Sequence, residues 1–265
     1  MKRFTKLLLI ITACLTVAIL SAGCTITLSP DFLIGRTSAT PTTSVDAAKM
    51  TNDITTDKIH ALFTIYAENQ KSKGSTLTAQ GSGVAFHQQD GYVYILTNCH
   101  VVLKREDYRS VKYSVKDYVG DTYSAELCHF AGKSESAISA DYDLAVIRFK
   151  TDSTYTTLNI AVSDPAVGET IVALGAPEHQ ANAITFGKVV SYITTEVDAD
   201  PSLSNVQFPV IYHDAFIDSG SSGGPIINSN YEIVGINYGG SEDNTVSLAV
   251  PATKVMEFMN TYVYE

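Results

Sequence analysis

The sequence predicts an all-β fold of two six-stranded antiparallel barrels followed by one C-terminal helix. The first observation is a series of about twelve short apolar or alternating segments, separated by turn residues at the intervals typical of barrels and sandwiches. The second is a polar, turn-prone break at 150–168, which divides these segments into two groups of about six. A single β-sandwich is the alternative that these two patterns leave open.

The apolar segments give the expected bounds of each strand. In the first group we expect strands at 61–67, 83–87, 92–97, 111–115, 123–129 and 144–149. In the second group we expect them at 170–175, 184–193, 209–216, 225–228, 232–238 and 246–250. A helix is expected after Pro251, where Val255, Phe258, Met259 and Val263 recur near helical spacing. Barrel 1 is therefore placed at about 58–150 and barrel 2 at about 165–250.

Residues 1–23 have the features of an export signal. A positively charged start, MKRFTK, precedes an apolar run at 7–20, and small residues then lead to Cys24. The string LSAGC resembles the lipobox of bacterial lipoproteins, which implies cleavage before Cys24 and lipidation of that cysteine. An uncleaved anchor helix and an ordinary cleavage site are the alternatives. We expect an exported protein that is anchored by lipid in the bacterial cell envelope, or that is secreted.

The segment at 24–57 is rich in Thr, Ser, Ala and Pro and predicts a flexible tether ahead of the domain at 58–265. The apolar fraction of 45% is typical of a globular protein. A formal net charge of −10 argues against nucleic acid as a partner, because phosphate binding needs clustered Lys and Arg. The oligomeric state has no signal in the sequence.

Two cysteines, Cys99 and Cys128, belong to the domain itself. An exported setting would permit a disulfide, but nothing in the sequence brings their Cα atoms within bonding reach, so we expect free thiols. Each is followed by a histidine, and neighbouring residues on a strand point to opposite faces. We therefore expect neither a zinc site nor any other metal site.

Three strings carry residues suited to nucleophilic catalysis. Ser222 lies in GSSGGP, where flanking glycines let backbone N–H groups approach a ligand. His100 lies in TNCHVV, directly after an apolar strand, and Asp143 begins another strand in DYDLAVIRF. Such catalysis needs a nucleophile, a base and a group that orients the base. Asp141 is the rival to Asp143, and lies further from the anchored strand.

Together these strings resemble the trypsin-like peptidases, most closely their bacterial HtrA/Deg branch. GSGVAFHQQDGYVYILTNCHVV is similar to the strand, turn and catalytic histidine of that branch, and DLAVIRF to its aspartate strand. HDAFIDSGSSGGPI is similar to its nucleophile loop. The likeness runs from about residue 58 to the end of the chain and implies two chymotrypsin-like barrels.

The resemblance also implies roles for individual residues. Ser222 would attack the scissile carbonyl, His100 would act as the base, and Asp143 would orient the imidazole. The N–H groups of Gly220 and Ser222 would bind the oxyanion. We place the substrate pocket at Phe216, Ile217, Asn237 and Tyr238. No cofactor is needed for this chemistry.

Some positions depart from the family pattern. Ser221 replaces the Asp of digestive trypsins, so activation by a freed N-terminus is not expected. Phe216 occupies the position of the acidic pocket residue of trypsin, which predicts aliphatic or small P1 side chains and little cleavage after Lys or Arg. Asp214 and Asp218 could still supply a charge to that pocket. The sequence after Ser222 is shorter than a PDZ domain needs, so we do not expect the PDZ domain of typical HtrA proteins.

The predicted function is that of a serine endopeptidase that hydrolyses protein or peptide substrates through an acyl-enzyme. Two alternatives remain open. One is a catalytically silent protein that keeps the barrels and uses the cleft for binding. The other is an esterase that uses the same triad.

Overall fold

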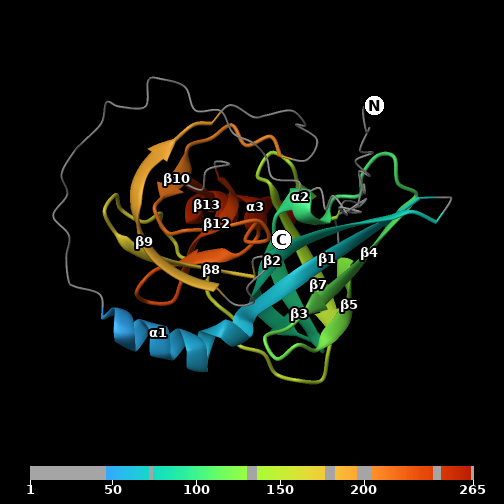
Figure 1. Cartoon of the computed structure of the whole chain (residues 1–265), viewed down its shortest axis with the longest axis horizontal. Coiled ribbons are helices and arrows are strands. Elements are labelled where there is room, and N and C mark those ends of the chain that lie inside the picture. The colour runs from blue at the N-terminus through green and yellow to red at the C-terminus, as the bar shows by residue number, and fades with distance from the viewer. Residues whose placement is uncertain are drawn as a thin grey trace, which may run out of the picture.

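The computed structural model describes residues 46–71, 74–129, 136–176, 183–195, 204–240 and 246–263. The expected signal at 1–23, the lipidation site Cys24 and most of the expected tether lie outside these residues. The described strands form two closed antiparallel barrels that lie side by side, with the earlier strands in one and the later strands in the other (Figure 1). The expected all-β fold of two barrels is confirmed.

Barrel 1 is built from the first group of strands. These are β1 (Leu62–Gln70), β2 (Thr76–Gln89), β3 (Tyr92–Thr97), β4 (Ser110–Lys116), β5 (Thr122–Leu127), β6 (Ile138–Ser139) and β7 (Leu144–Lys150). The sheet runs β3-β2-β1-β4-β5-β7, and the pairing of β3 with β7 closes it, while the short β6 adds to β7. Strand β2 begins earlier than the expected 83, because the polar residues from Thr76 onward pair with β1 in a long hairpin.

Barrel 2 contains the second group. Its strands are β8 (Thr170–Gly175), β9 (Ala183–Ile193), β10 (Val210–His213), β11 (Pro225–Ile227), β12 (Ile233–Gly240) and β13 (Ser247–Pro251). They close in the order β10-β13-β12-β11-β8-β9. A cluster of small and branched apolar side chains fills the interior: Ile171, Ala173, Val189, Ile211, Ile226, Val234 and Ala249. Strand β10 ends at His213 and not at the expected 216, because the Asp214 carboxylate and N–H bond to the backbone of Lys188.

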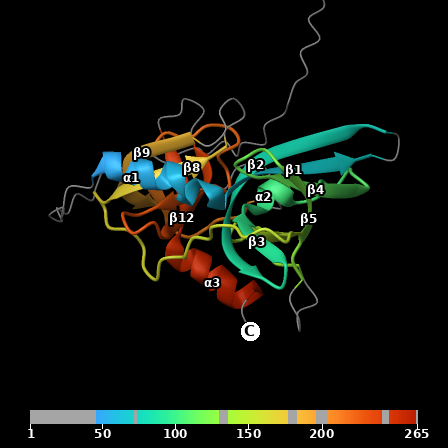
Figure 2. The same ribbon diagram turned by 90° about the horizontal axis from the view of Figure 1, so that it is seen from below.

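The C-terminal helix α3 (Ala252–Tyr262) links barrel 2 to a turn of barrel 1, and Figure 2 shows it at the lower edge of that view, below β12. Its buried face, which includes Val255 and Phe258, packs into the main hydrophobic core. At the turn that precedes β7, the Tyr142 hydroxyl donates to Glu257 Oε1 at 2.7 Å. Its ring lies 6.0 Å from that of Phe258, measured between centroids. The helix therefore supports the turn in which Asp143 lies.

A second helix, α1 (Ala47–Thr56), occupies part of the segment expected to be a flexible tether. Its N-cap Asp46 accepts a hydrogen bond from the Lys49 N–H, and Met50 and Ile54 are buried one turn apart. The Tyr231 hydroxyl of barrel 2 donates to Asp53 on the helix. After α1 a short 3-10 helix, η2 (Lys58–Ala61), leads into β1. Residues 47–56 thus differ from the expected tether. No helix in the described ranges is long and apolar enough to span a membrane.

Candidate active site

The candidate base and its orienting carboxylate come from the ends of two paired strands. His100 lies on α2 (Cys99–Val102), a single turn that begins two residues after β3 ends. Asp143 is the last residue before β7. Thr97 of β3 pairs with Ala145 of β7, so the two strands bring their ends together. The barrel register alone therefore places the histidine and the aspartate side by side.

The two side chains form a buried, doubly hydrogen-bonded pair. His100 Nδ1 lies 2.7 Å from Asp143 Oδ2, and the His100 backbone N–H donates to Oδ1 at 3.0 Å. The side chains of His100 and Asp143 are 5% and 0% exposed. A carboxylate can only accept, so Nδ1 carries a proton, and in the neutral imidazole Nε2 then has a free lone pair. This is the tautomer that a general base requires.

The backbone of Asp143 is held in an uncommon conformation. Its φ angle is 48°, in the left-handed region where Asp and Asn are the better tolerated residues after glycine. The Asn98 side-chain amide donates to the Asp143 carbonyl at 2.8 Å. Asp141, the rival candidate, is exposed and accepts from the Asn205 side chain at 2.8 Å. The structure thus brings Asp143 to His100 and directs Asp141 to a different partner.

Ser222 lies in the loop between β10 and β11, which packs directly against barrel 1. The Ser82 N–H donates to the Ser222 carbonyl at 2.7 Å. Gly223 has a φ of +87°, and a Cβ there would lie 2.1 Å from the Ser82 carbonyl oxygen and 2.4 Å from Thr97 Oγ1. Only glycine fits so close an approach. The serine is therefore carried on a loop seated at the end of β3, just ahead of α2.

Some backbone N–H groups of the Ser222 loop donate hydrogen bonds within the protein, and two do not. Ser219 and Ser221 donate to the side chain and the carbonyl of Asp218, at 2.7 and 2.9 Å, and Gly223 donates to the Asn237 carbonyl at 2.8 Å. The N–H groups of Gly220 and Ser222 donate to no residue that the structure describes. The Ser222 hydroxyl likewise bonds to none of the described residues, so its contact with His100 is not formed here. Such contacts are often loose before a substrate binds.

The family model described as trypsin-like peptidase domain matches residues 81–236, more than half of the chain. The chain belongs to the trypsin-like peptidase family.

Relatives of this trypsin-like peptidase include Serine protease Do-like HtrA of Bacillus subtilis, 34% identical over 195 residues that cover 71% of this chain and 40% of the relative. Mitochondrial Serine protease HTRA2 of Bos taurus is 34% identical over 167 residues, which cover 63% of this chain and 33% of the relative. The chain thus spans less than half the length of either. The active form of the Rv3671c protease from M. tuberculosis shares the fold, with a TM-score of 0.63 and 20% identity over 89% of this chain and 94% of that one.

The four residues expected in the substrate pocket of this trypsin-like peptidase differ in their surroundings. Phe216 is 52% exposed, and Ile217 is half-buried with its Cδ1 4.0 Å from the point where a Cβ on Gly240 would lie. Tyr238 is buried. Asn237 is also buried, and its Oδ1 lies 3.0 Å from Nε2 of His213. Phe216 and Ile217 are thus at least partly exposed, whereas Asn237 and Tyr238 are buried in the wall of barrel 2.

The buried histidine His213 is a feature that sequence reasoning left unassigned. Asn237 Oδ1 is its partner at Nε2, while Asn237 Nδ2 is buried with no hydrogen-bond partner among the described residues. Burial lowers the pKa of His213 to about 4 from the ordinary 6.5. The ring is therefore neutral in the folded peptidase at pH values where an unfolded chain would bind a proton.

The difference between the pKa of His213 in the folded and in the unfolded chain predicts that the stability depends on pH. As the pH falls from about 6.5 to about 4, the unfolded chain takes up a proton that native His213 does not. The free energy of unfolding should therefore fall by about 3 kcal/mol across this window, and the stability should be fully present above it. Urea unfolding at pH 7 and pH 4.5 measures the change. A His213→Gln variant should show a flatter dependence, and equal slopes in the two proteins would contradict the assignment.

Cys99 and Cys128 are free thiols, as expected, and both are buried. Burial raises the pKa of both thiols, that of Cys128 to about 12, and the charge of Asp143 adds to the effect at Cys99. The thiolate is the reactive form of cysteine, so neither group is a competing nucleophile. Among the described residues, no group of three or more His, Cys, Asp or Glu side chains is placed to hold a metal ion.

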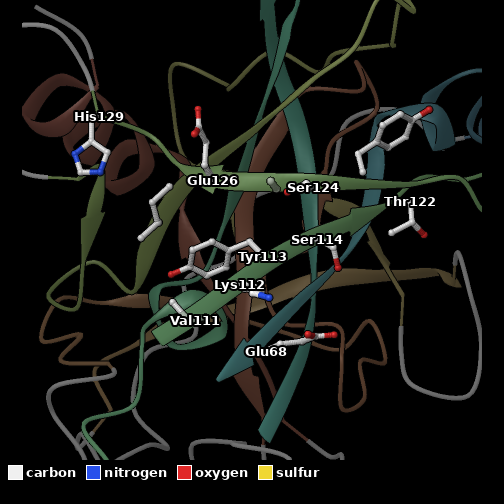
Figure 3. Close-up of a pocket in the computed structure, with 12 residues that line it drawn as sticks. Glu68, Val111, Lys112, Tyr113, Ser114, Thr122, Ser124, Glu126 and His129 are labelled. Atoms are coloured by element: carbon white, nitrogen blue, oxygen red, sulfur yellow. The ribbon is translucent and has the colours of Figure 1, made fainter. Parts of the chain in front are cut away.

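A cavity of about 750 Å³ lies on the wall of barrel 1, and none of the candidate site residues lines it. Figure 3 shows it where β4 and β5 diverge, with Val111 and Lys112 on one side and Glu126 and His129 on the other. The pairing of β4 with β5 ends at Tyr113 and Ala125, so Lys112 keeps only its partner in β1 and Glu126 only its partner in β7. The gap therefore lies where β4 and β5 stop pairing with each other.

Proposed function

We propose that this chain is a serine endopeptidase in which Ser222, His100 and Asp143 form the catalytic triad. The buried His100–Asp143 pair beside the loop of Ser222 is the observation that carries the proposal. Two relatives whose names state a serine protease support it. The fold alone would not support the proposal, because the same fold can carry unrelated functions.

The proposed reaction has two halves, formation of the acyl-enzyme and its hydrolysis, and the same catalytic groups act in both. Ser222 Oγ attacks the scissile carbonyl carbon while His100 Nε2 takes its proton, and Asp143 stabilises the imidazolium that results. The N–H groups of Gly220 and Ser222 donate to the oxyanion of the tetrahedral intermediate. His100 then gives its proton to the leaving amine. Water attacks the acyl-enzyme by the same steps, which releases the acid and restores the Ser222 hydroxyl.

We propose an apolar P1 pocket with Phe216 and Ile217 on its surface. The two carboxylates nearest to it in sequence already have partners: Asp214 Oδ1 accepts from the Lys188 N–H, and Asp218 Oδ1 accepts from the Ser219 N–H. A carboxylate that holds backbone N–H groups is less available to a substrate cation. Burial of a Lys or Arg side chain in this pocket without a partner for its charge would cost several kcal/mol.

Peptide-library cleavage by the mature domain tests the activity and the specificity together. We expect cleavage after Val, Ala or Leu, and labelling of the protein by a fluorophosphonate probe. A protein that neither cleaves peptides nor takes up the probe would be a silent binding protein. Turnover of short esters without peptide cleavage would indicate an esterase. Cleavage dominated by basic P1 residues and lost in Asp218→Ala would overturn the apolar pocket.

We also propose that Cys24 is the mature N-terminus and carries a lipid that anchors the peptidase in the cell envelope. The support is the LSAGC string after an apolar run. Expression with a clickable fatty acid should label the wild type and not the Cys24→Ser variant. If the wild type takes up no label and both proteins fractionate alike, the protein is secreted or held by an uncleaved helix.

A further inference from the structure

Ser82 of β2 contacts the candidate nucleophile loop through both its side chain and its backbone. The Ser82 hydroxyl donates to the Gly220 carbonyl at 2.7 Å, and the Ser82 N–H donates to the Ser222 carbonyl at 2.7 Å. The hydroxyl also accepts from the Ala176 N–H at 2.8 Å, at the end of β8. The residue is 1% exposed. One serine of barrel 1 thus joins two separate segments of barrel 2.

These bonds hold two peptide groups of the loop at both ends. In the peptide between residues 220 and 221, the carbonyl of Gly220 accepts from the Ser82 hydroxyl and the N–H of Ser221 donates to Asp218. In the peptide between 222 and 223, the carbonyl of Ser222 accepts from the Ser82 N–H and the N–H of Gly223 donates to Asn237. The free N–H of Ser222 lies between these two peptide groups, and the free N–H of Gly220 lies directly before the first of them.

We propose that Ser82 is a positioning residue that holds this loop so that the N–H groups of Gly220 and Ser222 can bind an oxyanion together. Gly220 has a φ of +92° and no Cβ, so its own sterics restrain the peptide weakly. The N–H of Ala176 occupies a lone pair of the Ser82 oxygen, which directs the hydroxyl proton to Gly220. The inference rests on the proposed peptidase function and adds to it a residue that touches neither substrate nor reacting atoms.

The test is Ser82→Ala in the full mature protein, with turnover measured per folded molecule. Removal of one oxyanion donor costs about 10²–10³ in turnover, so a loosened pair should cost about 10- to 100-fold. KM should change less than about twofold, because uniform substrate binding is untouched. A peptide aldehyde forms a tetrahedral adduct with Ser222, so its affinity should fall by the same factor as turnover. A product peptide, which forms no oxyanion, should bind about as before.

Two further variants separate positioning from mere stability. Ser82→Cys fills a similar volume with a weak donor, so it should lose turnover and aldehyde affinity even if Ser82→Ala folds poorly. Tyr155→Phe is the matched control: its hydroxyl bridges Asp117 and Tyr123 at 2.8 and 3.0 Å inside barrel 1. This control should lose stability and keep wild-type turnover.

The outcomes distinguish the inference from the function on which it rests. Wild-type turnover and aldehyde affinity in Ser82→Ala or Ser82→Cys would overturn the positioning role and leave the peptidase intact. An equal loss of turnover in Tyr155→Phe would also overturn it, because the effect would then follow from stability. A wild-type protein without peptidase activity or fluorophosphonate labelling would instead remove the proposed function.

Discussion

Replacement of Ser222 by alanine is expected to lower peptide turnover by about a millionfold and to leave the thermal midpoint nearly unchanged. The activity should vanish because no other hydroxyl is proposed to attack the substrate. The fold should persist because Ser222 is only partly buried and its hydroxyl bonds to no described residue. Turnover of a peptide identified by library profiling, together with thermal unfolding, measures the two quantities.

Ser221 supplies the control for this assignment, because it is the neighbouring serine in the same string. It is 4% exposed, and its Oγ accepts from the Asp218 N–H at 3.2 Å. Ser221→Ala should therefore reduce stability by about 1 kcal/mol and keep most of the activity. An inactive Ser221→Ala beside an active Ser222→Ala would mean that the register of the nucleophile is wrong.

The strands were predictable where the sequence is continuously apolar or alternates in hydrophobicity against a closed core. Tyr92–Thr97 and Thr170–Gly175 form strands with the expected bounds, because each is bounded by turn residues and lies in a barrel wall. The early part of β2, from Thr76 to Ser82, alternates only weakly, because Leu77 is its one large apolar residue. It is a strand because it pairs with β1 in a hairpin, and the hydrophobic pattern of this segment alone does not reveal that pairing.

Helix α1 is an element that the local sequence pattern likewise did not predict. Over ten residues it buries two large apolar side chains, Met50 and Ile54, and the surrounding Thr and Asn residues have poor helix propensity. Most of the stability of such a helix comes from tertiary packing, here with Tyr231 and the core of the barrels. Composition alone therefore indicated a tether.

In the candidate site, the sequence predicted the residue types better than the contacts among them. His100 and Asp143 were expected near strand ends, and the register of β3 and β7 explains why they meet. The contact of Ser82 with Gly220 joins residues 138 positions apart in two different barrels, so no local pattern could reveal it. The same holds for His213 and Asn237, which meet only inside the closed second barrel.

Asp143→Asn is expected to lower turnover by about 10⁴-fold with little change in KM. The amide oxygen can still accept from the His100 backbone N–H, and Asn tolerates the left-handed backbone at this position, so the fold should persist. The amide nitrogen, however, would then face His100 Nδ1 as a donor. The imidazole would have to accept there and carry its proton on Nε2, where it cannot take a proton from Ser222. Steady-state kinetics and the NMR signals of the ring protons measure both consequences.

Asp141→Asn is the matched control, because it makes the same chemical change two residues away in the same turn. Asp141 is exposed and accepts from Asn205, and an asparagine can keep that bond. Its turnover should stay within a few-fold of the wild type, and the His100 ring should keep its proton on Nδ1. Severe loss in Asp141→Asn alone would assign the orienting role to the wrong aspartate. Severe loss in both variants would mean that the turn, and not the carboxylate at His100, limits the reaction.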